Sequence, residues 1–235
     1  MLNIKENIYN IKENIKEVCY KINRNPEDIK VIAVTKTIDV DRIKFAIDCG
    51  VSSIGENKVQ EILEKYDKID KSIEWHMIGH LQTNKVKYII DKVDMIHSLD
   101  SIKLAKEIEK RAAKISREID VLIQINVANE ESKFGIHPDD VYEFIDEMVR
   151  FKYIKVKGLM TIAPYAENPE EVRKYFKEMK SIFEQVNMKY CENYENIEMK
   201  YLSMGMTNDY LVAIEEGANI VRIGTGIFGK RNYNK

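Results

Sequence analysis

The stretch Ile29-Lys30-Val31-Ile32-Ala33-Val34-Thr35-Lys36-Thr37 is a short run rich in β-branched and apolar residues. Such a run predicts a buried β-strand. The strand is expected to stop at Lys36, which stands between two threonines. Burial disfavours the charged form of an amine, and a neutral amine is a nucleophile towards aldehydes. The stretch alone leaves open whether Lys36 has this role or simply reaches solvent where the strand ends.

Outward from this stretch, helix-like and strand-like segments alternate along the chain. Helices are expected at 39–49, with Gly50 as C-terminal cap, and at 58–66, 83–91, 102–117, 138–150, 169–188 and 208–216. The other expected strands are 51–54, 73–78, 95–96, 121–126, 156–160, 199–202 and 219–223. Strict alternation implies a parallel sheet, and the number of units fits an α/β fold with a single (β/α)₈ TIM barrel. The polar and glycine-rich clusters all follow strands, so they should meet at one mouth of that barrel.

The N-terminal segment precedes the first strand and has its own pattern. Its apolar residues recur at steps of four and three, which is typical of one face of an amphipathic helix. These residues are Ile4, Ile8, Ile11, Ile15, Val18 and Ile22. The pair Asn25-Pro26 should end the helix. We expect an extra helix packed on the outside of the barrel.

The composition indicates a globular protein with one domain. The chain has 235 residues, of which 44% are hydrophobic and 32% charged, and no linker-like segment divides it, so the predicted domain is 1–235. A net charge of −2 argues against nucleic acid as a partner. No apolar run approaches the roughly 20 residues of a membrane span, and no signal peptide is recognised. Cys19, Cys49 and Cys191 are far apart, which favours reduced thiols and a cytoplasmic location.

The glycine-rich segment Gly224-Thr225-Gly226-Ile227-Phe228-Gly229 follows the last expected strand. It matches the G-x-G-x-x-G dinucleotide fingerprint, but only six residues remain after it, too few for a second βαβ unit. A phosphate site is the better interpretation, because barrels commonly bind phosphate at the loops after strands seven and eight. Backbone amides of a glycine-rich turn can bind an anion, and Ser203 and Thr225 could add hydroxyl groups.

Arg222 and two histidines are further candidates for functional residues. Arg222 faces away from its apolar strand neighbours, either into the barrel interior or outward between helices. His76 and His80 are four residues apart, but Gly79 interrupts the helix that metal binding at this spacing requires, so no metal site is predicted. Hydrogen bonding at the barrel mouth is the expected role of the two histidines. Asp100 and Asp209 are expected to cap the helices that follow them.

Taken together, these features resemble the pyridoxal 5′-phosphate (PLP) homeostasis family, single-domain relatives of the alanine racemase barrel. The matching motifs span nearly the whole chain: AVTKT (33–37), GENKVQE (55–61), WHMIGHLQTNK (75–85), SKFG (132–135), GLMTIAP (158–164), LSMGMTND (202–209) and VRIGTGIFGKR (221–231). Two positions depart from the usual pattern. Lys58 stands where an aromatic residue is common, and Gly226 stands where alanine is usual.

The resemblance implies that Lys36 forms a Schiff base with the aldehyde of PLP. It implies further cofactor-binding residues, which are Asn57, His80, Met160, Ser203, Met204, Arg222, Gly224 and Thr225. Among these, Ser203, Gly224 and Thr225, with backbone near Met204, would hold the phosphate. Arg222 would face the pyridine nitrogen and Asn57 would lie beside the ring, while His80 and Met160 would line the site.

The function implied by the resemblance is intracellular PLP homeostasis: the protein holds the cofactor and supplies or buffers it for PLP-dependent apoenzymes. An arginine beside the ring nitrogen makes the ring a weaker electron sink. In alanine racemase a tyrosine from a second domain of the partner subunit supplies the other acid/base group, and this sequence shows no such domain. We therefore expect a monomeric carrier without robust turnover. Two alternatives stay open, a racemase or lyase that uses Lys36 as its single base, and a barrel that has lost the cofactor.

Overall fold

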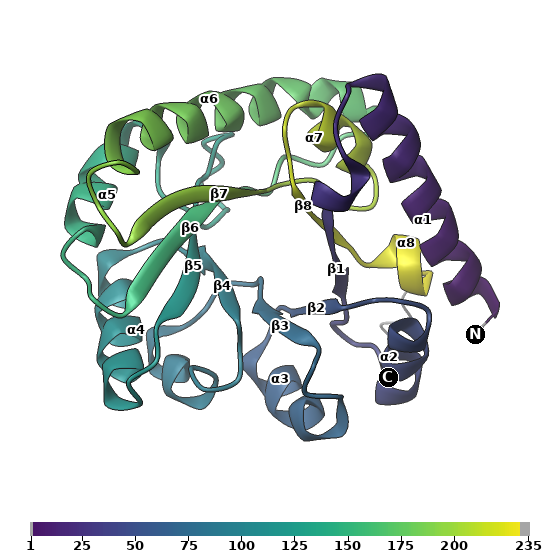
Figure 1. Ribbon diagram of the computed structural model, residues 1–235, viewed down its shortest axis with the longest axis horizontal. Helices are drawn as coiled ribbons and strands as arrows, with labels where there is room; N and C mark the ends of the chain where they lie inside the picture. Colours follow the sequence, from purple (N-terminus) through teal and green to yellow (C-terminus); the bar gives the residue numbers. More distant parts are fainter. Residues whose placement is uncertain (1, 231–235) are drawn as a thin grey trace.

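Residues 2–230 are described by the computed structural model, and their eight parallel strands close into a barrel (Figure 1). The strands follow one another around the barrel in chain order, and β8 pairs with β1. They are β1 (Lys30–Val34), β2 (Ser53–Glu56), β3 (Glu74–Met77), β4 (Met95–Leu99), β5 (Ile119–Gln124), β6 (Ile154–Met160), β7 (Ile197–Ser203) and β8 (Ile220–Ile223). The predicted closed barrel is confirmed. The predicted extent 1–235 and the end of the last motif at Arg231 reach beyond the described residues.

Helices cover the outside of the barrel (Figure 1). The α-helices are α1 (Leu2–Lys21), α2 (Val40–Asp48), α3 (Val59–Lys65), α4 (Ile102–Lys114), α5 (Val141–Met148), α6 (Arg173–Tyr190), α7 (Tyr210–Glu215) and α8 (Thr225–Phe228). Short 3₁₀ helices are η1 (Pro26–Asp28), η2 (Tyr66–Lys68), η3 (Thr83–Tyr88), η4 (Pro138–Asp140) and η5 (Pro169–Val172).

Two segments differ from the local structure expected of the sequence. The segment 83–91 contains the 3₁₀ helix η3 in place of an α-helix. Val86 is the one buried residue of η3, and Gln82 gives no side-chain cap, so little packing energy favours a regular α-helix there. The glycine-rich segment was expected as a turn, but it contains the short helix α8, which begins directly after Gly224.

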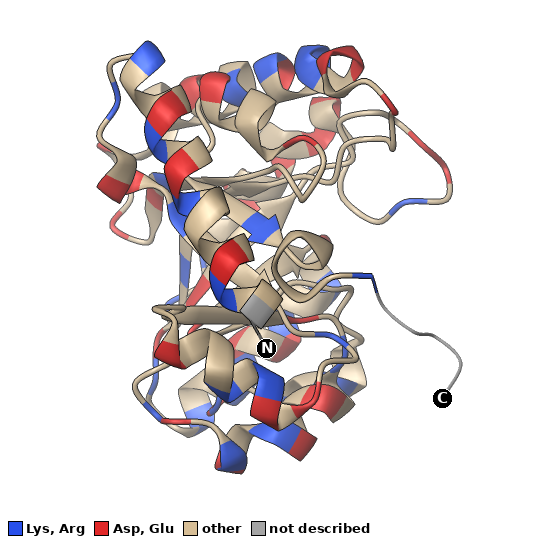
Figure 2. Ribbon diagram, turned by 90° about the vertical axis from the view of Figure 1, so that its right-hand side faces the viewer, with Lys and Arg blue, Asp and Glu red and all other residues tan. Residues whose placement is uncertain are grey.

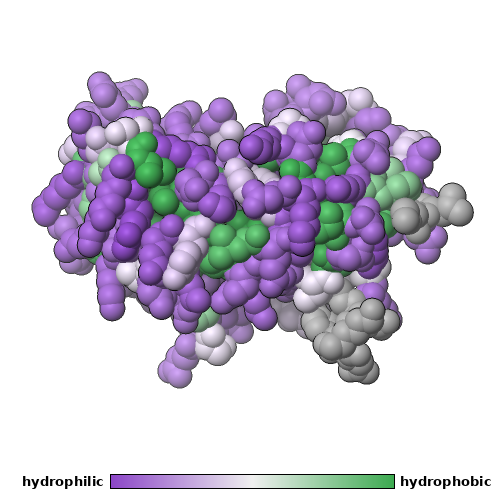
Figure 3. All heavy atoms as spheres, turned by 90° about the horizontal axis from the view of Figure 1, so that it is seen from below, coloured by the Kyte–Doolittle hydropathy of each residue, from purple (hydrophilic) through white to green (hydrophobic). Residues whose placement is uncertain are grey.

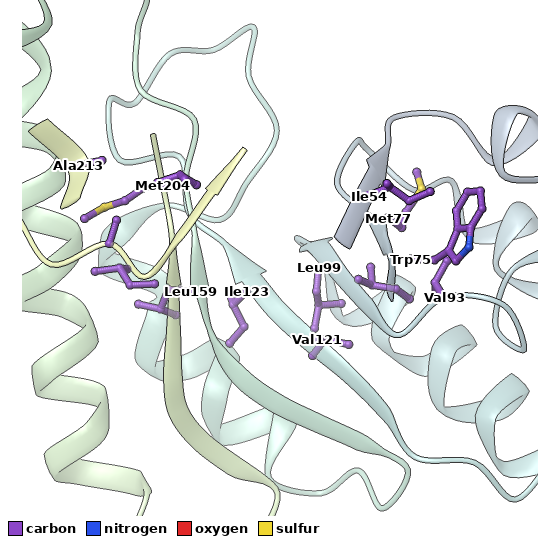
Figure 4. Close-up of a cluster of buried hydrophobic side chains, with 14 of the residues drawn as sticks. Ile54, Trp75, Met77, Val93, Leu99, Val121, Ile123, Leu159, Met204 and Ala213 are labelled. Atoms are coloured by element: carbon purple, nitrogen blue, oxygen red, sulfur yellow. The ribbon is translucent and has the colours of Figure 1, made fainter. Parts of the chain in front are cut away.

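The main core lies between the outer face of the barrel and the helices. Parallel strands are buried on both faces, which is why they read as nearly continuous apolar runs. Figure 4 shows buried outward-facing side chains of β4, β5 and β6, which are Leu99, Val121, Ile123 and Leu159. Leu122 and Met160 belong to a separate buried cluster with Met95, inside the barrel. Successive side chains of each strand therefore point alternately towards the helical layer and into the barrel interior.

Helix α1 packs on the outside of the barrel, as predicted. Its apolar stripe is buried from Ile4 to Val18. The helix lies beside α7 and α8 (Figure 1), and Asn7 Nδ2 donates to the carbonyl of Ile227 at 2.9 Å. Charges of both signs are intermixed over the outer helices (Figure 2), and the face seen in Figure 3 is largely hydrophilic with smaller hydrophobic areas. Within residues 2–230 no helix is long and apolar enough to cross a membrane.

A close approach of two strands yields the first prediction. Gly158 on β6 has a φ of +146°, and a Cβ there would lie 1.8 Å from the carbonyl oxygen of Tyr201 on β7. Because the obstacle is backbone, Gly158→Ala should lower the free energy of unfolding by roughly 3 kcal/mol or more. Urea unfolding monitored by circular dichroism measures this.

Gly217 provides a matched control for that substitution. It also has a positive φ, +101°, but its Cβ would meet only the flexible side chain of Lys180. Gly217→Ala should therefore cost about 1–2 kcal/mol, the penalty of the left-handed backbone alone. Equal losses in the two variants would show that β7 does not restrict position 158.

Candidate functional site

Lys36 lies at the mouth of the barrel, in the turn that follows β1. The strand ends at Val34, two residues earlier than the sequence indicated. The amide of Ile38 donates to the carbonyl of Thr35 at 3.0 Å, which makes Lys36 and Thr37 the central residues of a turn. Thr37 has a φ of +62°, which no strand residue adopts. The side chain of Lys36 is partly buried.

Arg222 points into the barrel interior, one of the two directions left open by its alternation. It is 4% exposed, and it donates to Ser203 Oγ at 2.7 Å and to the carbonyl of Thr161 at 2.8 Å. Burial lowers the pKa of its guanidinium to about 10, against a raising effect of Asp209, so the group is charged at neutral pH. Within residues 2–230 it forms no salt bridge. An interior cation without an anionic partner is costly, which points to a binding role.

A chain of polar side chains runs from Arg222 through the barrel interior. Ser203 Oγ lies 3.2 Å from His97 Nδ1, His97 Nε2 lies 3.0 Å from His76 Nδ1, and His76 Nε2 lies 3.4 Å from Glu74 Oε2. The predicted hydrogen bonding of His76 is confirmed, but it takes place in the barrel interior and not at the mouth. His76 belongs to β3, where alternation turns its side chain inward, whereas His80 follows the strand.

The direction of these hydrogen bonds is fixed when both imidazole rings are neutral. Hydrogen bonds from His76, Lys30 and Ser53 hold the pKa of the Glu74 carboxyl well below its usual range, so Glu74 accepts. His76 then donates through Nε2 and accepts at Nδ1, and His97 must donate through Nε2. The Ser203 hydroxyl donates to His97 Nδ1, since its oxygen already accepts from Arg222. The chain thus joins the buried cation Arg222 to Glu74, a half-exposed anion at the opposite, N-terminal end of the strands.

The buried His97 makes stability depend on pH. Burial lowers the pKa of His97 well below its usual value of about 6.5, and the charges of Arg222 and Lys30 lower it further. In acid the unfolded chain therefore binds a proton at His97 that the folded chain does not, so stability falls as pH falls below 6.5. We expect this group to remove about 1.4 kcal/mol of unfolding free energy between pH 7.5 and pH 5.5.

Urea titrations at these two pH values measure the effect. His97→Gln should flatten the pH dependence by that amount, whatever the substitution costs at pH 7.5. His137→Gln replaces an exposed histidine outside the barrel interior and is the control for the substitution itself. If wild type and His97→Gln lost the same free energy in acid, His97 would have to bind its proton in the folded chain as well.

The expected phosphate turn follows β8 at the same mouth. Gly224 precedes α8, whose first amides have no partner within the helix. Thr225 Oγ1 lies 3.2 Å from Thr207 Oγ1, and the amide of Gly226 donates to Thr207 Oγ1 at 3.1 Å. A Cβ at position 226 would lie 3.1 Å from Thr207 Cγ2, so the lack of a side chain at Gly226 leaves room for Thr207. Sequence reasoning missed Thr207, although it stands within the LSMGMTND motif.

The remaining predicted residues occupy different environments. The side chain of Met204 is in the main core near Ala213 (Figure 4), and its amide donates to the carbonyl of Ile220 at 3.1 Å. Its own N–H is thus unavailable to a phosphate. Met160 is buried inside the barrel. Asn57 directly follows β2, and its backbone carbonyl would lie 2.5 Å from a Cβ at position 79, so glycine is required there.

His80 lies over the loop that follows β5. Its ring stacks on Phe134 with centroids 3.7 Å apart, and its Nδ1 lies 3.2 Å from Asp100 Oδ2. Gln124 Nε2 donates to the carbonyl of Phe134 at 2.9 Å, which ties the loop to the end of β5. The expectation that Asp100 caps the next helix is wrong, because the Ser101 hydroxyl takes that role. Burial raises the pKa of Asp100 while His80 lowers it.

Asp209 also differs from its expected role. It stands at the start of α7, but no side-chain cap hydrogen bond is formed there. Its Oδ1 accepts from the amide of Met206 at 2.6 Å, which closes the turn after β7. Burial raises the pKa of Asp209, although the hydrogen bond from Met206 and the charge of Arg222 lower it. Asp209 therefore lies near Arg222 without pairing with it directly.

Comparison with known proteins places this geometry in a class. Residues 7–232 match the family described as alanine racemase, N-terminal domain. A pyridoxal phosphate homeostasis protein from Aquifex aeolicus is 45% identical and covers 99% of this chain and 100% of its own length. One from Haemophilus influenzae is 36% identical, with 99% of this chain and 98% of the relative covered. PipY of Synechococcus elongatus, solved with PLP bound, has a TM-score of 0.78 at 27% identity and covers 92% of this chain and 100% of its own.

The fold and the mouth thus define a barrel of the alanine racemase N-terminal class. Within that class, the chain belongs to the pyridoxal phosphate homeostasis family. The family indicated by the sequence motifs is confirmed.

The residues at the mouth fit PLP. This cofactor supplies an aldehyde that an amine can attack, an electron-poor pyridine ring and a phosphate. Lys36 offers the amine, and the hydroxyls of Thr207 and Thr225 with the backbone amide of Thr225 offer donors suited to a phosphate. Arg222 has five N–H donors, of which two have partners within residues 2–230. A ring nitrogen can accept from one of the others.

Proposed function

We propose that this chain binds PLP at the mouth of its barrel, as a Schiff base with Lys36, and that it holds, buffers and supplies the cofactor inside the cell. One observation carries the proposal: β1 and β8 are neighbours, and they bring Lys36 to the same mouth as the buried cation Arg222 and the turn at Gly224. The names of the Aquifex and Haemophilus relatives and the PLP-bound PipY structure support it.

Arg222 favours binding of the cofactor over catalytic turnover of substrates. A fixed positive charge beside the ring nitrogen disfavours its protonation, and an unprotonated ring withdraws electrons less strongly. The chain of hydrogen bonds through Ser203 and His97 keeps the guanidinium in place. We propose that the whole chain, 1–235, acts as one such domain, as a monomer. The free thiols of Cys19, Cys49 and Cys191 support a location in the cytoplasm.

A transfer assay tests this function. The PLP-loaded chain is mixed with a PLP-dependent apoenzyme and an excess of a phosphatase that destroys free PLP. Activity of the apoenzyme should recover, whereas an equal amount of free PLP should be destroyed before it restores activity. Recovery no better than with free PLP would contradict direct supply.

The alternative function, a racemase or lyase with Lys36 as its single base, predicts proton exchange at the α-carbon of amino acids. Incubation of the loaded chain with a panel of L-amino acids in deuterated water, followed by NMR, measures that exchange. The carrier function predicts rates far below about 1 s⁻¹, the lower end of ordinary enzymatic turnover. Exchange at that rate or faster would favour an enzyme.

A further inference from the structure

A buried ionic cluster lies directly beneath the turn that presents Lys36. Lys65, the last residue of α3, uses all three of its ammonium protons: Nζ donates to Glu56 Oε1 at 2.8 Å, to Glu61 Oε2 at 2.7 Å and to the carbonyl of Thr35 at 2.9 Å. The Thr35 hydroxyl also donates to Glu56 Oε1, at 2.6 Å. These residues come from the segments AVTKT and GENKVQE and from the end of α3, the helix that begins within the second segment.

The cluster forms hydrogen bonds with the backbone on both sides of Lys36. Lys65 binds the carbonyl of the residue before it, Thr35, and Glu61 Oε2 accepts from the amide of the residue after it, Thr37, at 2.6 Å. Thr37 has a φ of +62°, a conformation that a β-branched residue adopts only when its surroundings impose it. The Glu61 carboxylate holds the Thr37 amide, and so this strained turn, in place.

Stability alone is a poor explanation for such a cluster. Glu56 is fully buried, its Oε2 has no partner within residues 2–230, and burial raises the pKa of its carboxyl. Lys65 is nearly fully buried, and Glu61 is mostly covered. Buried ion pairs often stabilise a fold no better than apolar side chains of similar size, because each charge loses its hydration. These hydrogen bonds do restrict the backbone at residue 36 to one conformation.

We propose that Glu61 and Lys65, supported by Glu56, form a clamp that positions Lys36 for bond formation with an aldehyde ligand. The clamp fixes the peptide groups on both sides of residue 36. The Lys36 side chain is therefore directed one way, and little conformational freedom is lost when its amine reaches the ligand. In the bond-forming step the Lys36 nitrogen replaces the aldehyde oxygen, which leaves as water with both amine protons, and no oxidant or reductant is needed. The clamp is a positioning device that rests on the function proposed for Lys36.

The test compares two ligands that differ only in the aldehyde. PLP can bond to Lys36, whereas pyridoxine 5′-phosphate has the same ring and phosphate but an alcohol in place of the aldehyde. Glu61→Ala should weaken PLP binding about tenfold, the equivalent of one lost hydrogen bond, and reduce the visible absorbance per bound PLP. It should leave the affinity for pyridoxine 5′-phosphate unchanged. Fluorescence titration with both ligands and absorbance at saturation give these quantities.

Two further variants make the comparison specific. Glu61→Gln retains an oxygen that can accept from the Thr37 amide, so it should keep much of the affinity for PLP that Glu61→Ala loses. Glu107→Ala is the control, because Glu107 forms the same i,i+4 ion pair, with Arg111 on α4. It should behave as wild type with both ligands.

The outcomes separate the clamp from the function on which it rests. If Glu61→Ala weakened both ligands equally, or neither, while the wild type showed the Schiff base absorbance, the clamp would be refuted and the role of Lys36 retained. If the wild type bound PLP without that absorbance, both the clamp and the Schiff base at Lys36 would be refuted.

Discussion

A Lys36→Ala chain should lose the visible absorbance that the wild type develops with PLP. The Schiff base shifts the absorbance of the cofactor, and the turn after β1 presents the amine at the mouth where the phosphate turn also lies. Arg222, Thr207 and Thr225 remain in this variant, so it should still bind the phosphate and ring, more weakly and with the spectrum of the free aldehyde. A titration of each chain with PLP, followed by absorbance, measures both the band and the affinity.

Lys58→Ala is the control for that experiment. Lys58 is an exposed lysine at the start of α3, also near the end of a strand, but no strained turn or buried cluster presents it. It should show the wild-type band at full intensity. Borohydride reduction followed by peptide mass spectrometry should place the cofactor on Lys36 in both the wild type and Lys58→Ala. A band that survives in Lys36→Ala would mean that another lysine carries the aldehyde.

The barrel could be predicted from the sequence because parallel strands buried on both faces stand out as apolar runs. The end of β1 could not. Thr35, Lys36 and Thr37 continue a pattern typical of a strand, and the interaction that accompanies the turn comes from Glu61, 24 residues away, through the Thr37 amide. Local pattern therefore located Lys36 but missed the turn in which it lies.

The interior of the barrel was the least predictable part. Alternation gave Arg222 two possible directions, and only the closed barrel decides between them. His76 and His97 lie on adjacent strands, and their contact follows from the register that pairs His76 with Met95. That register is a long-range property which no spacing within one strand reveals. The spacing of Glu61 and Lys65, four residues apart on a helix, was a signal that could have been used.

Arg222→Met should weaken PLP binding by about 10- to 100-fold, because it removes a charge-assisted hydrogen bond of about 1.5–3 kcal/mol to the ring nitrogen. The free energy of unfolding of the cofactor-free chain is subject to two effects of opposite sign. Methionine fills a similar volume without a charge, so the desolvation cost of a buried guanidinium disappears while the carbonyl of Thr161 loses its donor. These two effects oppose each other, and the unfolding free energy should change by no more than about 2 kcal/mol.

Arg111→Met is the matched control, because Arg111 makes its ion pair with Glu107 on the surface of α4, away from the mouth. It should bind PLP as the wild type does. Ser203→Ala adds a graded test: it removes one partner of Arg222 but keeps the guanidinium, so its loss of affinity should lie between those of the control and Arg222→Met. If Arg222→Met bound PLP as tightly as Arg111→Met, the buried cation would serve the interior chain to His97 and Glu74, and the ring nitrogen would have another partner.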